Sequence, residues 1–135
     1  MDSSVVLRIV KEGSPAARAW FDRALAAGDT FLASRLMVAE VLRVLRNNDL
    51  SQATAEDVIS RFVLLSLDDA LVAEAVAIGP VVGAADGLHL ASAARVGVGA
   101  VAVVTHDRQM ARAAEALGFA VVDPVTDDPG RPAVV

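Results

Sequence analysis

The sequence predicts a single α/β domain, a three-layer sandwich in which helices flank a mostly parallel central sheet. Short apolar runs that suit strands alternate along the chain with longer segments that suit helices. The length of 135 residues is near the common size of one domain, and 55% of the residues are hydrophobic, enough to bury one core. No linker or internal repeat is visible, so residues 1–135 are expected to form one domain, with 123–135 as a loosely held tail.

In the first half of the chain, single residues mark where helices start and end. Ser14 followed by Pro15 is typical of a helix start, with serine as the cap and proline at the first helical position, and Gly28 is typical of a helix end. Thr54 and Asp57 have the spacing of a capping box, with aspartate in place of the usual glutamate. The expected elements are helices at 15–27, 34–47 and from about 54, and strands at 31–33 and 63–66.

The second half continues the alternation. Asp68 is expected to cap a helix that Gly79 and Pro80 close. Residues 100–104 form a continuous apolar run, which suits a strand buried on both faces. The remaining expected elements are helices at 84–96 and 106–117, each followed by a glycine, and a last strand at 119–122.

The composition limits the kind of site the chain can hold. It contains no cysteine, so a metal ion would have to be bound by oxygen ligands or by His89 and His106, which favours hard cations such as Mg²⁺ or Mn²⁺. The formal net charge of -5 argues against a nucleic-acid binder that relies on a basic surface. A nuclease with this charge would need metal ions for part of the neutralisation.

Neither a membrane span nor a targeting segment is predicted. Residues 70–106 are strongly apolar, but Glu74, Asp86 and Arg95 divide the stretch, and its longest uncharged run is too short to cross a bilayer. No charged segment followed by an apolar one opens the sequence. A cytoplasmic location is therefore expected.

Four carboxylates that interrupt apolar sequence are the candidate site residues: Asp2, Glu40, Asp86 and Asp107. A buried charge is costly and is normally kept only with a partner or a metal. Asp107 also follows the apolar run 100–104 at its carboxyl end, where open α/β sheets place their ligand sites. Four carboxylates from separate segments are an expected ligand set for one or two octahedral Mg²⁺ ions, and without metal they would repel one another.

Each carboxylate also has a purely structural interpretation. Asp2 and Asp86 could cap helices, and Asp107 could favour the dipole of a first helical turn. Glu40 could instead pair with Arg35 or Arg43 along its own helix. Two further candidates stay open in the same way: His89 could line the site or be a structural residue, and Arg108 with Arg112 could meet RNA phosphates or face solvent.

Four motifs resemble those of the PIN-domain ribonucleases, in order and spacing across essentially the whole chain. Asp2-Ser3-Ser4 resembles the opening motif, an aspartate followed two residues later by serine or threonine. The other three resemble the glutamate-bearing helix, the aspartate-containing helix start and the final acidic turn of the family, and they occupy residues 34–45, 85–93 and 103–108. The short chain looks most like the VapC toxins, the toxin half of bacterial toxin–antitoxin pairs.

The resemblance implies a function and a set of site residues. It implies a Mg²⁺-dependent (or Mn²⁺-dependent) endoribonuclease toxin of a type II toxin–antitoxin system, which hydrolyses RNA phosphodiester bonds. Metal ligands and catalytic residues would be Asp2, Glu40, Asp86 and Asp107, with the hydroxyls of Ser4 and Thr105 as supports. The implied partners are a VapB-like antitoxin and a second copy of the chain in a homodimer, besides the RNA substrate.

Two competing functions are left open by the sequence. PIN domains usually have a short apolar strand before the first aspartate, whereas only Met1 precedes Asp2, so either the natural start lies upstream or the sheet is weakened. The second case favours a non-catalytic PIN-like protein that binds a partner. A phosphotransferase with Asp2 as nucleophile would need a second acid two residues later, where the chain has Ser4.

Overall fold

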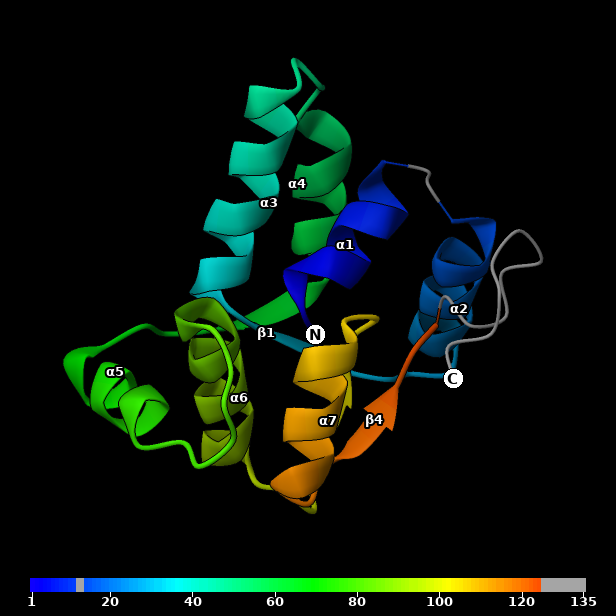
Figure 1. Ribbon diagram of the computed structural model, residues 1–135. Helices are drawn as coiled ribbons and strands as arrows, with labels where there is room; N and C mark the ends of the chain where they lie inside the picture. Colours follow the sequence, from blue (N-terminus) through cyan, green and yellow to red (C-terminus); the bar gives the residue numbers. More distant parts are fainter. Residues whose placement is uncertain (12–13, 125–135) are drawn as a thin grey trace.

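The computed structural model describes residues 1–11 and 14–124, which form helices interleaved with short strands (Figure 1). The elements in chain order are α1 (Ser3–Val10), α2 (Pro15–Ala26), β1 (Phe31–Ser34), α3 (Arg35–Asn47), α4 (Ala53–Ile59), β2 (Phe62–Leu65), α5 (Asp69–Val76), α6 (Ala84–Val96), β3 (Ala102–Val104), α7 (Arg108–Ala116) and β4 (Ala120–Val122). The predicted α/β class is confirmed. Of the expected tail, residues 125–135 lie outside the described residues.

The helix starts at Ser14, Ser34 and Asp68 follow the capping signals, but the predicted start at Thr54 does not, and α5 ends at Val76, before the predicted stop at Gly79 and Pro80. Ser14 Oγ accepts a hydrogen bond from the Ala17 backbone N–H at 3.2 Å, as expected of a serine cap before Pro15. The capping box predicted at Thr54 is wrong, because α4 begins one residue earlier. The Ser51 hydroxyl accepts from the Ala53 N–H at 3.3 Å and so satisfies the helix start before Thr54 is reached.

The strands pair in parallel, as predicted, but they form two separate sheets. β1 pairs with β2 and β3 pairs with β4. Among the described residues, the first two connect these sheets through the backbone: the Met1 amino group donates to the Leu32 carbonyl at 2.7 Å, and the Asp2 N–H donates to the Val104 carbonyl at 3.0 Å. The expected single central sheet is therefore divided, because just two residues of extended chain lie between β1 and β3.

A cavity of about 630 Å³ occupies the space beside this short connection. Residues of β1 and β3 line it, together with Asp2 and His89. Ala102 of β3 is exposed and also lines the cavity, so the prediction that this strand is buried on both faces is wrong at that position. The physical reason is that Ala102 borders the open cavity, whereas Val103 and Val104 pack into the hydrophobic clusters.

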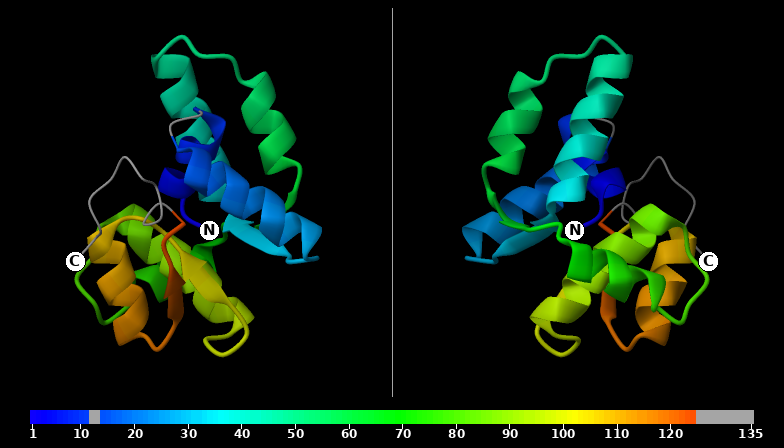
Figure 2. Two further views of the ribbon diagram at one scale, coloured as in Figure 1. Left: turned by 90° about the vertical axis from the view of Figure 1, so that its right-hand side faces the viewer. Right: turned by 90° about the vertical axis from the view of Figure 1, so that its left-hand side faces the viewer.

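Two hydrophobic clusters meet at β3. The larger one packs α1 to α4 against β1 and β2 and includes Val104, whereas the smaller one packs α6, α7 and β4 and includes Val103. Neighbouring residues of a strand point to opposite faces, so β3 contributes to both clusters. Figure 2 shows the N-terminus at the meeting point of these two parts of the molecule.

Helix α1 is anchored to the hydrophobic core by its apolar face. Val5, Val6, Ile9 and Val10 are buried along one face of this helix. The helix thereby fixes the direction in which Asp2, at its N-terminal end, enters the protein. In the part of the chain that the structure describes, no helix is long and apolar enough to cross a membrane.

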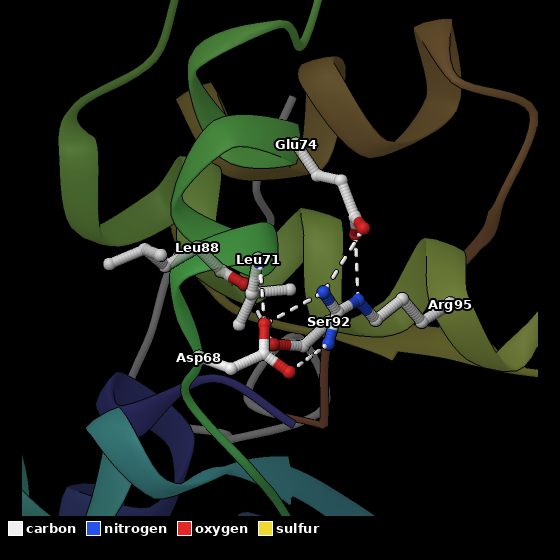
Figure 3. Close-up of polar contacts among 6 residues, drawn as sticks. All are labelled: Asp68, Leu71, Glu74, Leu88, Ser92 and Arg95. Carbon is white, nitrogen blue, oxygen red and sulfur yellow. Dashed lines mark hydrogen bonds and ion pairs between the residues drawn. The ribbon is translucent and has the colours of Figure 1, made fainter.

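Helix α5 is attached to α6 by an ion-pair cluster at the surface (Figure 3). The Arg95 guanidinium donates to both oxygens of Asp68 at 2.9 Å and to Glu74 at 2.7 and 3.0 Å. Asp68 also caps α5, as predicted, because its Oδ1 accepts from the Leu71 N–H at 2.7 Å. The two helices approach closely at Gly87, where an added Cβ would lie 3.4 Å from the Ala75 carbonyl oxygen.

Because of this cluster, we expect the protein to lose stability as the pH falls into the acid range. Hydrogen bonds from Arg95, followed by the one from Leu71, lower the pKa of Asp68 from 3.8 to about 2. A carboxyl whose folded-state pKa is lowered stabilises the fold above its unfolded-state pKa, and that contribution is lost as the pH falls through the folded-state value. We expect the Asp68→Asn variant, which keeps a good capping residue, to lose less stability than the wild type between pH 4 and 2.

Urea denaturation of both proteins across this range would check the prediction. Parallel pH profiles for the wild type and Asp68→Asn would contradict it.

Candidate functional site

The carboxylate of Asp2 lies at the centre of a network of hydroxyl donors. Asp2 is 5% exposed and occupies the N-cap position of α1, but its side chain does not cap the helix. It accepts instead from Ser3 Oγ at 3.3 Å, from Ser4 Oγ, and from Thr105 Oγ1 at 2.9 Å. The helix-capping interpretation of Asp2 is therefore wrong, and the expected proximity of the Ser4 and Thr105 hydroxyls is observed.

Thr105 connects two of the candidate carboxylates. Its side chain is fully buried, and its hydroxyl donates to Asp2 while accepting from the Asp107 backbone N–H at 3.0 Å. The residues come from opposite ends of the chain, because Asp2 precedes α1 and Asp107 follows β3. One hydroxyl thus fixes the position of Asp2 relative to the turn that carries Asp107.

Asp107 caps α7 and belongs to the same turn. Its Oδ1 accepts from the N–H groups of Gln109 at 2.7 Å and Met110 at 3.1 Å. Both bonds end on Oδ1, so Oδ2 takes no part in the capping. Asp107 thus lies at the N-cap position and not within the first helical turn, and a second role is compatible with this position because the residue is exposed.

Glu40 is held by His89 from a different helix. The Glu40 Oε2 atom lies 2.8 Å from His89 Nε2, and the His89 side chain is only 4% exposed whereas that of Glu40 is 29% exposed. The alternative in which Glu40 pairs with Arg35 or Arg43 is not observed among the described residues. The contact joins α3 to α6 and fixes the Glu40 carboxylate at the surface of the protein.

This contact predicts a positioning role for His89. Without the imidazole, Glu40 would sample more rotamers, so we expect His89→Ala to lower any activity of the site about tenfold. His89→Gln, which keeps a donor near Glu40, should recover part of the loss. Equal activity of His89→Ala and the wild type would show that the orientation of Glu40 does not matter.

The pKa of Asp86 depends on the other acids that lie near it. It lies in the first turn of α6 and is partly buried. Burial raises the pKa of the Asp86 carboxyl, and the negative charges of Asp2, Asp107 and Glu40 raise it further, while His89 lowers it. The raised pKa of Asp86 therefore indicates that Asp2, Glu40 and Asp107 lie near enough to act on the Asp86 carboxyl electrostatically.

The four acids come from four segments: the start of α1, the middle of α3, the start of α6 and the loop after β3. They concentrate negative charge that no described lysine or arginine neutralises through an ion pair. Carboxylate oxygens suit a hard divalent cation, which would relieve this repulsion. Within residues 1–11 and 14–124, however, no three acidic or histidine side chains lie close enough to form a preassembled ligand group.

His89 is the site residue that sequence reasoning undervalued. Its position three residues after Asp86 places both side chains on one face of α6, and this spacing was the available signal. Arg108 and Arg112, the candidate phosphate contacts on α7, are exposed and form no ion pair with a described residue.

Comparison with known proteins identifies the family. No curated protein and no solved structure matches the chain. The PIN domain matches residues 1–116, a range that includes all four carboxylates and both supporting hydroxyls. The chain therefore belongs to the PIN-domain family, whose fold is of the nuclease type.

Proposed function

We propose that this chain is a Mg²⁺-dependent endoribonuclease that hydrolyses RNA phosphodiester bonds at the four carboxylates. The observation that carries the proposal is the placement of Asp86, whose pKa is raised first by burial and then by the nearby charges of Asp2, Asp107 and Glu40. Such a cluster raises the energy of the metal-free protein and is relieved by a divalent cation.

The residues divide into ligands and supports. Asp2, Glu40, Asp86 and Asp107 would hold the cation, with Mn²⁺ as a substitute for Mg²⁺. When bound, the cation supplies stabilisation of the negative charge that develops on the scissile phosphate and lowers the pKa of water. Donors from neighbouring segments hold two of the carboxylates: Ser4 and Thr105 hold Asp2, and His89 holds Glu40.

Each support acts by restricting one carboxylate. Asp2 is buried with three hydroxyl donors, so its position is set before any ligand arrives. Asp107 is oriented through its bonds to the start of α7. Asp86 has no such restraint among the described contacts, and a nearby cation would favour its charged form, which burial and the neighbouring acids disfavour.

The biological role we propose is that of a VapC-like toxin of a type II toxin–antitoxin pair, acting in the cytoplasm. Its support is the four motifs in family order. A VapB-like antitoxin and a homodimer are proposed as partners on the same grounds. Several large apolar side chains are exposed and available for such contacts, among them Val72, Val76 and Val81.

The function is tested by incubating the purified protein with a labelled pool of tRNA, ribosomal RNA and messenger RNA, in Mg²⁺, in Mn²⁺ and in EDTA. We expect cleavage with either metal and none with EDTA, with products that carry 5′-phosphate and 3′-hydroxyl ends. A folded, metal-binding protein that cuts no RNA in this pool would remove the assignment.

A non-catalytic PIN-like protein that binds a partner is the second candidate. The divided sheet and the lack of a preassembled ligand group among the described residues favour it. It predicts that Mg²⁺ does not raise the melting temperature, because a ligand stabilises a fold only if it binds the folded state. A clear rise with Mg²⁺ would exclude this candidate.

A further inference from the structure

A second hollow, distinct from the cavity between the sheets, lies along the outer face of α1. Its volume is about 370 Å³, and Ser4, Leu7, Arg8, Lys11 and His106 line it. Four of these residues follow the helical spacing of three and four positions, so they form one stripe on α1 and just beyond its end. We call this hollow the α1 groove.

One end of the α1 groove adjoins the carboxylates. Ser4 lines the groove and donates through its hydroxyl to Asp2. His106 lines it as well, precedes Asp107 in sequence, and donates through Nε2 to the Ser4 carbonyl oxygen at 3.2 Å. From Ser4 to Lys11 the stripe extends about 10 Å along the helix axis. A chain bound at the carboxylates could therefore continue into the groove without leaving the surface.

The other end of the groove is basic. Arg8 and Lys11 form no ion pair with any described residue, whereas Arg18, Arg61 and Arg95 each pair with carboxylates. Two cations thus lie beside the acidic site of a chain whose formal net charge is -5. An approaching polyanion would be repelled by the carboxylates and attracted by these two side chains.

A purely structural explanation for the positions of Arg8 and Lys11 is the helix dipole. Arg8 lies in the last turn of α1 and Lys11 follows it, where cations are favourable without any ligand. That explanation does not require a groove that adjoins the carboxylates. It also predicts that removal of the charges lowers stability slightly and leaves nucleic-acid binding unchanged, so the two interpretations differ in a measurable way.

We infer that the α1 groove binds the backbone of single-stranded RNA next to the scissile bond, an inference that rests on the proposed function for the identity of its ligand. Arg8 and Lys11 contact phosphates, and Leu7 provides an apolar surface for the ribose or base between them. The side chains of Arg8 and Lys11 lie outside the carboxylate cluster. They therefore contribute to RNA binding and to the register of the RNA rather than to bond cleavage.

The experiment compares the double variant Arg8→Gln with Lys11→Gln against Arg46→Gln, which removes an exposed arginine from the last turn of α3. Binding of a short single-stranded RNA is measured in an Asp86→Asn background, at several salt concentrations. Each lost phosphate contact removes about 0.7 from the salt slope, so the double variant should bind roughly 10- to 30-fold more weakly at about 0.1 M salt. In the cleavage-competent background KM should rise with kcat nearly unchanged.

The outcomes separate this inference from the proposed function. Unchanged affinity and salt slope in the double variant, with a wild type that cuts RNA, would overturn the groove and leave the nuclease standing. Weaker binding in the double variant, with a wild type that never cuts, would support the groove and remove the nuclease. A wild type that binds no single-stranded RNA would overturn the groove as well.

Discussion

Asp86→Asn is expected to lower RNA cleavage about 10³-fold or more, because it removes a ligand of an ion that supplies several kcal/mol of transition-state stabilisation. The same change should leave the metal-free protein at least as stable as the wild type. The reason is the raised pKa of Asp86: in the fold its charged form is disfavoured by burial and by its acidic neighbours, and asparagine has no charge to disfavour. Stabilisation by Mg²⁺ should largely disappear.

Cleavage assays with matched melting curves, with and without Mg²⁺, would measure these effects together. Asp69→Asn serves as the control because Asp69 is an exposed carboxylate of α5 that does not contribute to the raised pKa of Asp86. Cleavage by Asp86→Asn within tenfold of the wild type would remove Asp86 from the catalytic set. A large fall in stability without metal would instead make Asp86 a structural residue.

Thr105→Val is expected to affect both stability and activity. Valine keeps the shape of threonine but loses the hydroxyl, which leaves the Asp107 N–H without its observed partner and removes one donor from Asp2. An unsatisfied buried polar group costs about 1 to 3 kcal/mol of folding free energy. Because the position of Asp2 is also loosened, cleavage should fall by roughly 10- to 100-fold.

Thr105→Ser is the matched comparison, since it restores a hydroxyl at the same position. We expect it to recover most of the activity and to lose less stability than Thr105→Val in chemical denaturation. Equal behaviour of the serine and valine variants would show that the hydroxyl bridge between Asp2 and Asp107 has no function.

The sequence predicted those features of the fold that depend on nearby residues. Ser14 before Pro15 located the start of α2, and Gly28, with a φ of 87°, ends that helix as expected. The start of α4 was misplaced because Ser51 and Thr54 compete for the same role, and only the folded backbone decides between them. The division of the sheet could not be predicted, since strand patterns do not show which strand edges meet.

In the candidate site, too, the sequence predicted the individual residues but not the contacts between distant segments. Asp2, Glu40, Asp86 and Asp107 stood out because each interrupts apolar sequence, and the structure places the other three within electrostatic reach of Asp86. The pairing of Glu40 with His89 was missed because the two residues are 49 positions apart, and they meet only when α3 packs against α6.

The most direct test of the central claim is a crystal structure of the protein soaked in Mn²⁺, with anomalous scattering measured to locate the ion. We expect an anomalous peak among Asp2, Glu40, Asp86 and Asp107, with oxygen ligands from these carboxylates and from water. The absence of any peak at full Mn²⁺ saturation, or Mn²⁺ bound only elsewhere on the protein, would contradict the proposed metal site.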